Sequence, residues 1–494
     1  MSGVKKFLRG VVTSYIYIII TSIVALWLTP YTLSFIDKSH YGYYVLLADI
    51  ITWVNLLQFG VSGVFNSKAA MCIGKKDYVS LQKYTSTAQI MQGTSSVLVL
   101  VIGLILTLFI DKMVDTTGIS KFDVVTTFLL ALITSVVTIF KQPLSAILVA
   151  NKQIHIDNIL QLGLFIVQAL LTVLFLNLGY SIVSLAASHL IAVIIITFIT
   201  YIRVKRLPFK LNLFPGGFDK DVFVEMLSTG LWFSVGSIGQ IFIYKVDKFF
   251  IGSYISLSIV TSYYITSKLY DFANVFYSNF VNISRPYFSQ LYAKGESAKL
   301  SQLYDTFLNG SILLLVFICS AIYLVNPWFI GWWIKGDQAA YLGDTISFLI
   351  ALSVILQSSI LTNRVLLAST LYKVKNQGLT RVLEGTVKFL CSIFLISKYG
   401  IIGLLISSII SCISCSTIVM NYLSNKALDR SIRYQFANYI PYLSLLILLA
   451  LWFIPNKLVG LFVLLSCYFV LALIVRKNLS ADTVLLLKSI IKRK

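Results

Sequence analysis

The chain has 494 residues, of which 58% are hydrophobic and only 12% are charged. A water-soluble domain covers its surface with polar groups, so this composition excludes a soluble globule and indicates an integral membrane protein. The formal net charge is +21. In a membrane protein, basic loops set the topology and attract anionic lipids, so we expect no nucleic-acid partner.

Apolar blocks of about 20 residues, the length that crosses a hydrocarbon core as a helix, recur along the chain. The first block has a basic start, but it is too long for a cleaved signal peptide and lacks a small-residue exit. The sequence therefore predicts an all-α membrane protein with fourteen transmembrane helices. They lie near residues 10–33, 41–62, 88–110, 122–142, 157–178, 181–202, 226–245, 256–281, 306–325, 345–368, 379–397, 401–421, 438–455 and 457–475.

With fourteen spans, alternate loops lie on the same side of the membrane as the N-terminus. Basic residues concentrate in these loops and in the C-terminal tail, for example at 75–76, 203–206 and 492–494. This asymmetry is typical of cytoplasmic loops and predicts that both termini are cytoplasmic. Loops on the other side are short, the longest lying near 111–121 and 326–344. They leave no room for an extracytoplasmic catalytic domain, which argues against a membrane-embedded polysaccharide polymerase or glycosyltransferase.

The longest polar interruption runs from residue 203 to residue 225 and contains Pro208 and Pro215. We interpret its central part as a cytoplasmic linker between two sets of six helices. The predicted organisation is an N-terminal six-helix bundle at 1–205, a linker at 206–221, a second six-helix bundle at 222–421, and a C-terminal helix pair with a basic tail at 422–494.

The two sets of six helices show short matches at a nearly constant shift. The run 75–77, Lys-Lys-Asp, resembles the run 294–296, Lys-Gly-Glu, and Gly179 corresponds to Gly400. This regularity predicts an internal duplication. Because each half has an even number of spans, the expected repeat is parallel, about an axis along the membrane normal, with a cavity between the halves.

Cations within the predicted spans are few and expensive, because a charge in the bilayer needs a partner, water or a function. Lys268 lies near the middle of the eighth span, Arg364 in the inner half of the tenth, and Lys388 in the eleventh. We predict that these three side chains face a hydrated cavity and hold an anionic group, Arg through its planar fork and Lys as a point charge.

The intramembrane carboxylates are Asp49, Asp271 and Glu384, which are candidates for ion coupling or for pairing. Asp271 is three residues from Lys268, and Glu384 is four residues from Lys388, so each pair shares a helical face. Two internal ion pairs are therefore an equally good interpretation of these residues.

Deep tyrosines offer a second kind of contact. Tyr15, Tyr270 and Tyr277 fall well inside predicted spans, where their rings are candidates for stacking on sugars, although packing with one hydrogen bond is the commoner role of a buried tyrosine. The chain has no phosphate-binding glycine loop and no histidine or cysteine spacing that indicates a metal site. We therefore expect no cofactor, no metal and no bond chemistry.

Several runs of residues, taken in order, resemble one family. Residues 29–36, 41–44 and 56–60 are similar to the opening of O-antigen and capsule flippases of the multidrug/oligosaccharidyl-lipid/polysaccharide exporter superfamily. In the second half, residues 247–252 resemble that family's D-x-x-I-I-G motif, and residues 398–403 resemble the turn before its twelfth span.

The resemblance implies two six-helix bundles in a V around a central cavity, alternating access, and a location in the bacterial inner membrane. It implies an undecaprenyl-pyrophosphate-linked oligosaccharide as cargo, either an O-antigen or a capsule repeat unit, and coupling to a Na⁺ or H⁺ gradient. The chain departs from some relatives in having no Lys or Arg within the first two spans. A cationic site is therefore expected from the second half.

Two other functions compete with this flippase. A cation-coupled multidrug extruder of the same superfamily would use intramembrane carboxylates such as Asp49 and Asp271. The excess of Lys and Arg within the second half instead favours an anionic cargo. A membrane-embedded polymerase or glycosyltransferase is the alternative from a different class, and the short outer loops argue against it.

Overall fold

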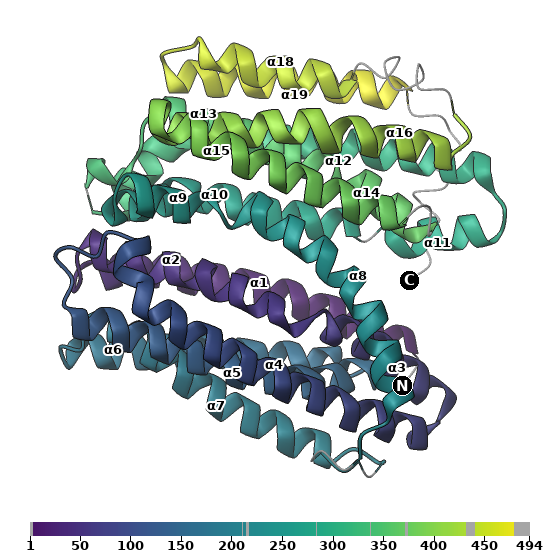
Figure 1. The fold of residues 1–494 in the computed structure, drawn as a ribbon. Helices are drawn as coiled ribbons and strands as arrows, with labels where there is room; N and C mark the ends of the chain where they lie inside the picture. Colours follow the sequence, from purple (N-terminus) through teal and green to yellow (C-terminus); the bar gives the residue numbers. More distant parts are fainter. Residues whose placement is uncertain are drawn as a thin grey trace. The chain divides into compact units, whose positions relative to one another are not determined.

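The computed structural model describes residues 3–209, 211–213, 217–282, 284–335, 337–370, 374–430 and 440–478. All the regular secondary structure in these ranges is helical (Figure 1). Contacts divide the chain into two compact units, Met1–Thr261 and Ser262–Lys494. The predicted all-α architecture is therefore confirmed.

The first unit packs its helices around α5 and α7, which contact each other most extensively, with α4 against α5 and with α1 and α7 against α6. Large apolar side chains such as Leu108 and Phe198 remain exposed on it, as lipid-facing helices require. Its elements are α1 (Gly3–Leu33), α2 (Lys38–Val54), η1 (Asn55–Gln58), α3 (Val61–Lys75), α4 (Tyr78–Met113), α5 (Lys121–Ala150), α6 (Ile154–Asn177), α7 (Val183–Lys205), α8 (Lys220–Tyr244) and α9 (Asp247–Tyr254).

The second unit is built around α12 and α15, which both contact α13. Helix α10 (Leu257–Asn282) begins at the end of the first unit and continues through the start of the second. The other elements are α11 (Arg285–Ala293), α12 (Ser297–Trp333), η2 (Gln338–Ala340), α13 (Asp344–Ser359), α14 (Leu361–Ser369), α15 (Val374–Ser411), the π-helical turn η3 (Cys412–Thr417), α16 (Ile418–Ala427), α18 (Ile440–Trp452) and α19 (Lys457–Asn478).

Within the described residues, nine helices are long and apolar enough to cross a membrane, or ten if one bent pair counts as a single span. Each of the fourteen predicted ranges overlaps a helix. Two of them fall on α15, whose two helical parts are separated by the non-helical Gly400, with φ 57°. The bond between Ser392 and Ser407 shows that these two parts lie side by side. Others, such as α18, are short. The chain is a multi-pass membrane protein, while the count of fourteen and the two six-helix bundles stay predictions.

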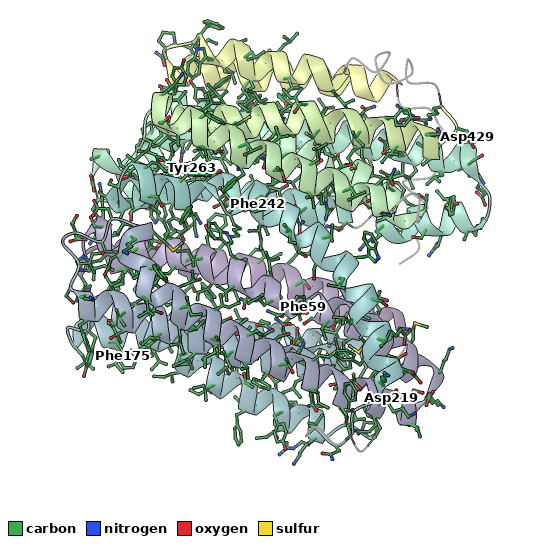
Figure 2. All side chains as sticks on the ribbon, viewed as in Figure 1. Phe59, Phe175, Asp219, Phe242, Tyr263 and Asp429 are labelled. Atoms are coloured by element: carbon green, nitrogen blue, oxygen red, sulfur yellow. The ribbon has the colours of Figure 1, made fainter. Side chains whose placement is uncertain are left out.

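The second predicted span is a broken helix. It consists of α2, the short η1 and α3, and its two parts are bent by 58°. The break falls at Phe59 and Gly60, both in the left-handed region, with φ 49° and 66° (Phe59 is labelled in Figure 2). Glycine adopts this conformation without a Cβ clash, so Gly60 is the residue that permits the bend.

The predicted linker is packed against the first unit along its described part. Leu207, Phe209 and Leu213 are buried in one apolar cluster with residues of α3, α4, α5 and α8. The side chain of Gln82 exchanges two hydrogen bonds, of 2.9 and 2.8 Å, with the backbone of Asn212. These contacts hold the linker to the base of α4. The predicted domain boundaries, which follow the repeat, stay predictions.

The linker ends at Asp219, the N-cap of α8 (Figure 2). Its carboxylate accepts hydrogen bonds from the backbone of Asp221 and Val222, and it lies 3.1 Å from the ammonium of Lys83 on α4. The backbone bond from Val222 and then the bond from Lys83 lower the pKa of Asp219. The carboxylate is therefore ionised at neutral pH, as an N-cap requires.

Hydrogen bonds recur at matching places in the two halves. A buried hydroxyl pair joins Thr172 to Ser188 at 2.6 Å, and its counterpart joins Ser392 to Ser407 at 2.7 Å. In the first half a serine–asparagine bond joins Ser135 to Asn55, and in the second a like bond joins Ser358 to Asn274.

Backbone conformation repeats in the same way, because the matched positions Lys76 and Gly295 are both left-handed, as are Gly179 and Gly400. The matched hydrogen bonds and backbone conformations lie far apart along the chain, and in each match the two positions are close to 220 residues apart. They support the predicted duplication.

Helix α8 passes so close to the break in the second span that it needs a glycine there. A Cβ on Gly230 would lie 2.4 Å from the carbonyl oxygen of Phe59, whereas a Cβ on Gly236 of the same helix would meet nothing. We expect Gly230→Ala to lower the melting temperature of the purified protein. Gly236→Ala should leave it unchanged or raise it slightly, because alanine is favoured over glycine in a helix by about 0.5–1 kcal/mol. Equal melting temperatures for the two variants would contradict the close packing.

Candidate functional site

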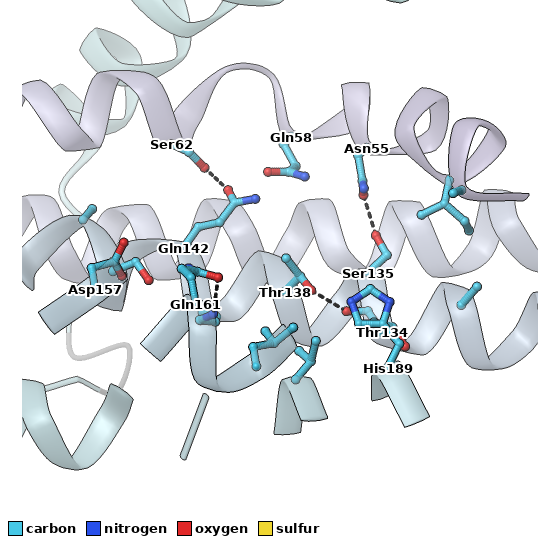
Figure 3. A pocket seen from close by; sticks show the side chains of 18 of the residues that line it. Asn55, Gln58, Ser62, Thr134, Ser135, Thr138, Gln142, Asp157, Gln161 and His189 are labelled. Carbon is cyan, nitrogen blue, oxygen red and sulfur yellow. Dashed lines mark hydrogen bonds between the residues drawn. The ribbon is translucent and has the colours of Figure 1, made fainter. Parts of the chain in front are cut away.

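The first unit encloses a cavity of about 950 Å³ between the broken helix α2–η1–α3 and helices α5, α6 and α7 (Figure 3). We call it the amide cavity after the five carboxamides in its lining. Its polar lining consists of the carboxamides of Asn55, Gln58, Asn66, Gln142 and Gln161, the hydroxyls of Tyr44, Ser62, Thr134, Ser135, Thr138 and Ser145, and the titratable groups of Lys141, Asp157 and His189. Aliphatic side chains, among them Leu47, Ile51, Leu164 and Val193, form the remaining wall.

The break in the second span places amide side chains at the cavity wall, where a regular helix would present apolar residues. Asn55 lies on η1 and accepts a 2.5 Å bond from the hydroxyl of Ser135 on α5. On the other side of the break, Ser62 of α3 donates to Gln142 and accepts a 2.9 Å bond from Gln92 of α4 (Figure 3). Irregular backbone at membrane depth is tolerated where it lines such a polar cavity.

Lys141 supplies the cation of the amide cavity. Its residue is 4% exposed, and its ammonium donates to the side-chain oxygen of Gln161 at 3.3 Å. Among the described residues it forms no ion pair, and Asp157, the cavity's carboxylate, lies one helix away on α6. The expectation that a cationic site comes from the second half stays a prediction, while the described cavity has its cation from the first half.

The sequence analysis missed Lys141 because it stands at the end of a predicted span, where a lysine ordinarily reaches the interface. One signal in the sequence could have identified Lys141. Lys141 follows Ser135 by six residues, as Arg364 follows Ser358, so the duplication aligns the two cations.

In the second unit, Arg364 and Glu384 form an ion pair between two helices. Arg364 of α14 is 6% exposed and Glu384 of α15 is 1% exposed, and their side chains are 3.4 Å apart. Ser416 donates to Glu384 and accepts from Arg364 at 3.2 Å. Ser416 lies in the π-helical turn, an irregularity that often marks a specialised position.

Lys388, one turn after Glu384 on α15, is also 1% exposed. Of the three cations proposed to face a hydrated cavity, Arg364 and Lys388 are thus enclosed in the second unit. Lys268, on α10, is only partly buried: its ammonium donates to the hydroxyl of Tyr264 and lies 4.4 Å from the centre of that ring and 5.3 Å from the ring of Phe272.

Asp49 is paired within the first unit. It is 2% exposed on α2, and its two oxygens lie 3.0 Å from the ammonium of Lys245 and 3.1 Å from that of Lys248. The two lysines stand at the junction of α8 and α9. The other predicted carboxylate, Asp271, is exposed on α10.

Two of the three tyrosines predicted to contact sugars are enclosed by protein. Tyr270 and Tyr277 are 0% exposed, with their hydroxyls bonded to Ser347 at 2.8 Å and to Ser311 at 3.3 Å. Both rings are enclosed in this conformation, and their contact with sugars stays a prediction. Tyr15 of α1 is partly exposed.

A family model described as polysaccharide biosynthesis protein matches residues 34–339, which is more than half of the chain. The chain belongs to this family. No curated protein sequence matches it. The predicted relation to a polysaccharide family is thereby confirmed.

Solved structures share the fold of this polysaccharide biosynthesis protein. The inward closed conformation of the lipid II flippase MurJ is similar with a TM-score of 0.67 and 14% identity, covering 95% of this chain and 99% of MurJ. A multidrug resistance MATE transporter is similar in its inward-facing conformation, with a TM-score of 0.65, 12% identity and coverage of 85% and 99%. Its outward-facing conformation has a TM-score of 0.62, 14% identity and coverage of 87% and 96%.

The buried Arg364–Glu384 pair generates a stability prediction. Arg364→Gln leaves the Glu384 carboxylate buried without its cation, which costs about 3–5 kcal/mol. We expect a clearly lower melting temperature, partly recovered when Glu384→Gln is added. A thiol-reactive dye suits the measurement, because Cys412 and Cys415 are free and buried until the protein unfolds.

The control for this prediction is Lys299→Gln, which removes an exposed ion pair with Glu296. Exposed pairs contribute at most about 1 kcal/mol, so this variant should melt close to the wild type. If Arg364→Gln melts like Lys299→Gln, the buried pair is not needed for stability.

Proposed function

We propose that this protein is a flippase that carries a lipid-linked oligosaccharide across the bacterial inner membrane by alternating access. The observation that carries the proposal is its membership of a polysaccharide biosynthesis family together with a transporter fold. The similar folds include a lipid II flippase and one transporter in both inward-facing and outward-facing conformations. A chain of this kind moves its cargo without breaking bonds.

The amide cavity supports a glycan-bearing cargo. Carboxamides both donate and accept hydrogen bonds, as do the hydroxyls of sugars, so five of them around one space suit a saccharide better than an apolar drug. The volume of about 950 Å³ is at the upper end of the range of about 300–1,000 Å³ found for ligand pockets.

The proposed cargo is an undecaprenyl-pyrophosphate-linked repeat unit of O-antigen or capsule. Among the second-half cations, we retain Lys268 as a candidate contact for an anionic group, because it keeps partial exposure. For Arg364 and Lys388, which are enclosed, we propose a structural role in this conformation.

Coupling to a Na⁺ or H⁺ gradient is part of the proposal. Asp49 and Glu384 are held in ion pairs in this conformation. Asp49, Asp271 and Glu384 stay the candidate coupling carboxylates, and the amide cavity adds Asp157 to them. A multidrug extruder is the second candidate, because MATE transporters share the fold. The cation and the many carboxamides of the amide cavity argue against a cationic drug as its ligand.

The proposed function predicts that the gene restores surface polysaccharide to a bacterial strain that lacks its own oligosaccharide flippase. The host must make a lipid-linked repeat unit, and surface polysaccharide is measured by immunoblot. A fusion that reports membrane insertion is the control for expression. Restored drug resistance without restored polysaccharide would favour the multidrug extruder instead.

The proposed topology predicts that reporter fusions after residues 215 and 485 both give a cytoplasmic signal, because the basic loops lie on that side. Both positions lie outside the described residues. An enzyme active only in the periplasm, fused at the same points, is the matched control and should stay inactive. A periplasmic signal at either position would refute cytoplasmic placement of the linker or of the C-terminus.

A further inference from the structure

We infer that the amide cavity binds an anionic saccharide, with the ammonium of Lys141 pairing with the anionic group and the carboxamides receiving the hydroxyls. The inference rests on the proposed function, which supplies a glycan as cargo. It goes further by assigning a binding site within the first unit and by naming the residue that selects the charge of the ligand.

The internal duplication supplies the first argument. The bonds Asn55–Ser135 and Asn274–Ser358 fix the alignment of α5 with α13 and α14, and that alignment places Lys141 opposite Arg364. Both halves therefore have a buried cation at the same point of the fourth helix, at 4% and 6% exposure.

A counter-ion in direct contact with the cation is present in only one half; in the other, Asp157 interacts with Lys141 without a direct contact. The hydroxyl pairs Thr172–Ser188 and Ser392–Ser407 fix the alignment of α6 with the first part of α15. In that alignment the position of Glu384, the partner of Arg364, is occupied by Leu164. Leu164 lines the amide cavity, so the first half has an open space where the second half has an ion pair.

Lys141 is left with unused hydrogen-bonding capacity. An ammonium has three donors, and among the described residues this one has a single acceptor, Gln161, at 3.3 Å. Asp157 is close enough to interact with this ammonium electrostatically but does not bond to it directly. A buried charge without a directly bonded partner is costly, and such residues are retained where they serve a function. An anionic group entering the cavity would supply the missing partner.

The remaining lining suits a sugar ring. Gln58 and Gln142 offer paired donors and acceptors from two sides of the cavity (Figure 3). Asn66 adds a third carboxamide, and the side chains of Leu47 and Ile51 add apolar surface for the C–H face of a ring. Asp157 has one buried oxygen without a hydrogen-bond partner, which is available to accept from a hydroxyl.

Two sources could supply the anion: an acidic sugar within the repeat unit, or the pyrophosphate that joins the glycan to its lipid. Both have the same chemistry, an oxyanion next to hydroxyl-bearing carbons, and both would form charge-assisted hydrogen bonds with Lys141. The probes must therefore separate a uronic acid from a pyrophosphate.

The test is isothermal titration of the purified full-length protein with methyl glucuronide, methyl glucoside and inorganic pyrophosphate. We expect methyl glucuronide, pyrophosphate or both to bind the wild type more tightly than the neutral glucoside. Lys141→Gln should weaken binding of the anionic probe by about tenfold to a hundredfold, the effect of losing one charge-assisted hydrogen bond. Lys141→Arg should retain most of the affinity. Lys121→Gln, which removes an exposed lysine from the same helix, is the matched control and should change nothing.

A second variant keeps the test decisive if Lys141→Gln fails to fold. Leu164→Glu places a carboxylate where the second half has Glu384, so it should pair with Lys141, preserve folding and abolish binding of the anion. Selective loss for glucuronide identifies an acidic sugar as the source, and selective loss for pyrophosphate identifies the lipid-linked end.

The inference is overturned if the folded wild type binds neither anionic probe. It is also overturned if the wild type binds glucuronide no better than glucoside and does not bind pyrophosphate. A third contradicting result is that Lys141→Gln and Leu164→Glu bind the anion as tightly as the wild type does. These results leave complementation of a flippase-deficient strain unaffected. Conversely, Lys141-dependent binding without complementation would keep the site and reject the flippase.

Discussion

A polar group among membrane-spanning helices must find its partner inside the protein, because lipid offers none. The described helices satisfy this requirement mostly with short-range pairs. Asp49 lies between two lysines, Arg364 bonds to Glu384 and Ser416, and matched hydroxyls join neighbouring helices in both halves. Where the pairs are incomplete, as around Lys141, polar side chains surround an open space instead.

Much of the fold follows from the sequence, because apolar blocks of bilayer length have no stable alternative to a helix in lipid. The duplication was also accessible, since a short match such as 75–77 with 294–296 marks a left-handed turn at Lys76 and at Gly295. The number of spans is harder to predict, because some predicted blocks fall on helices that are short or interrupted, such as α18 and the two parts of α15 that meet at the non-helical Gly400.

The candidate site was much harder to predict from the sequence. Sequence spacing pairs Glu384 with Lys388 on one helix, but the side chain of Glu384 bonds to Arg364 on another, a contact that depends on how the helices pack. The positions of Tyr270 and Tyr277 within predicted spans did not reveal that both side chains are enclosed by protein. The amide cavity depends on a break in a helix and on residues from six elements, which no local pattern brings together.

The break at Phe59 and Gly60 has an electrostatic consequence. Helix α3 starts anew at Val61, where Gly63 and Val64 donate to the carbonyl of Gly60, and Ser62 in this first turn lines the amide cavity. The N-terminal end of a helix has a partial positive charge of roughly half an elementary unit. The bend therefore brings a fixed dipole to the cavity wall, and the field that an anion meets there comes from the backbone as well as from lysine.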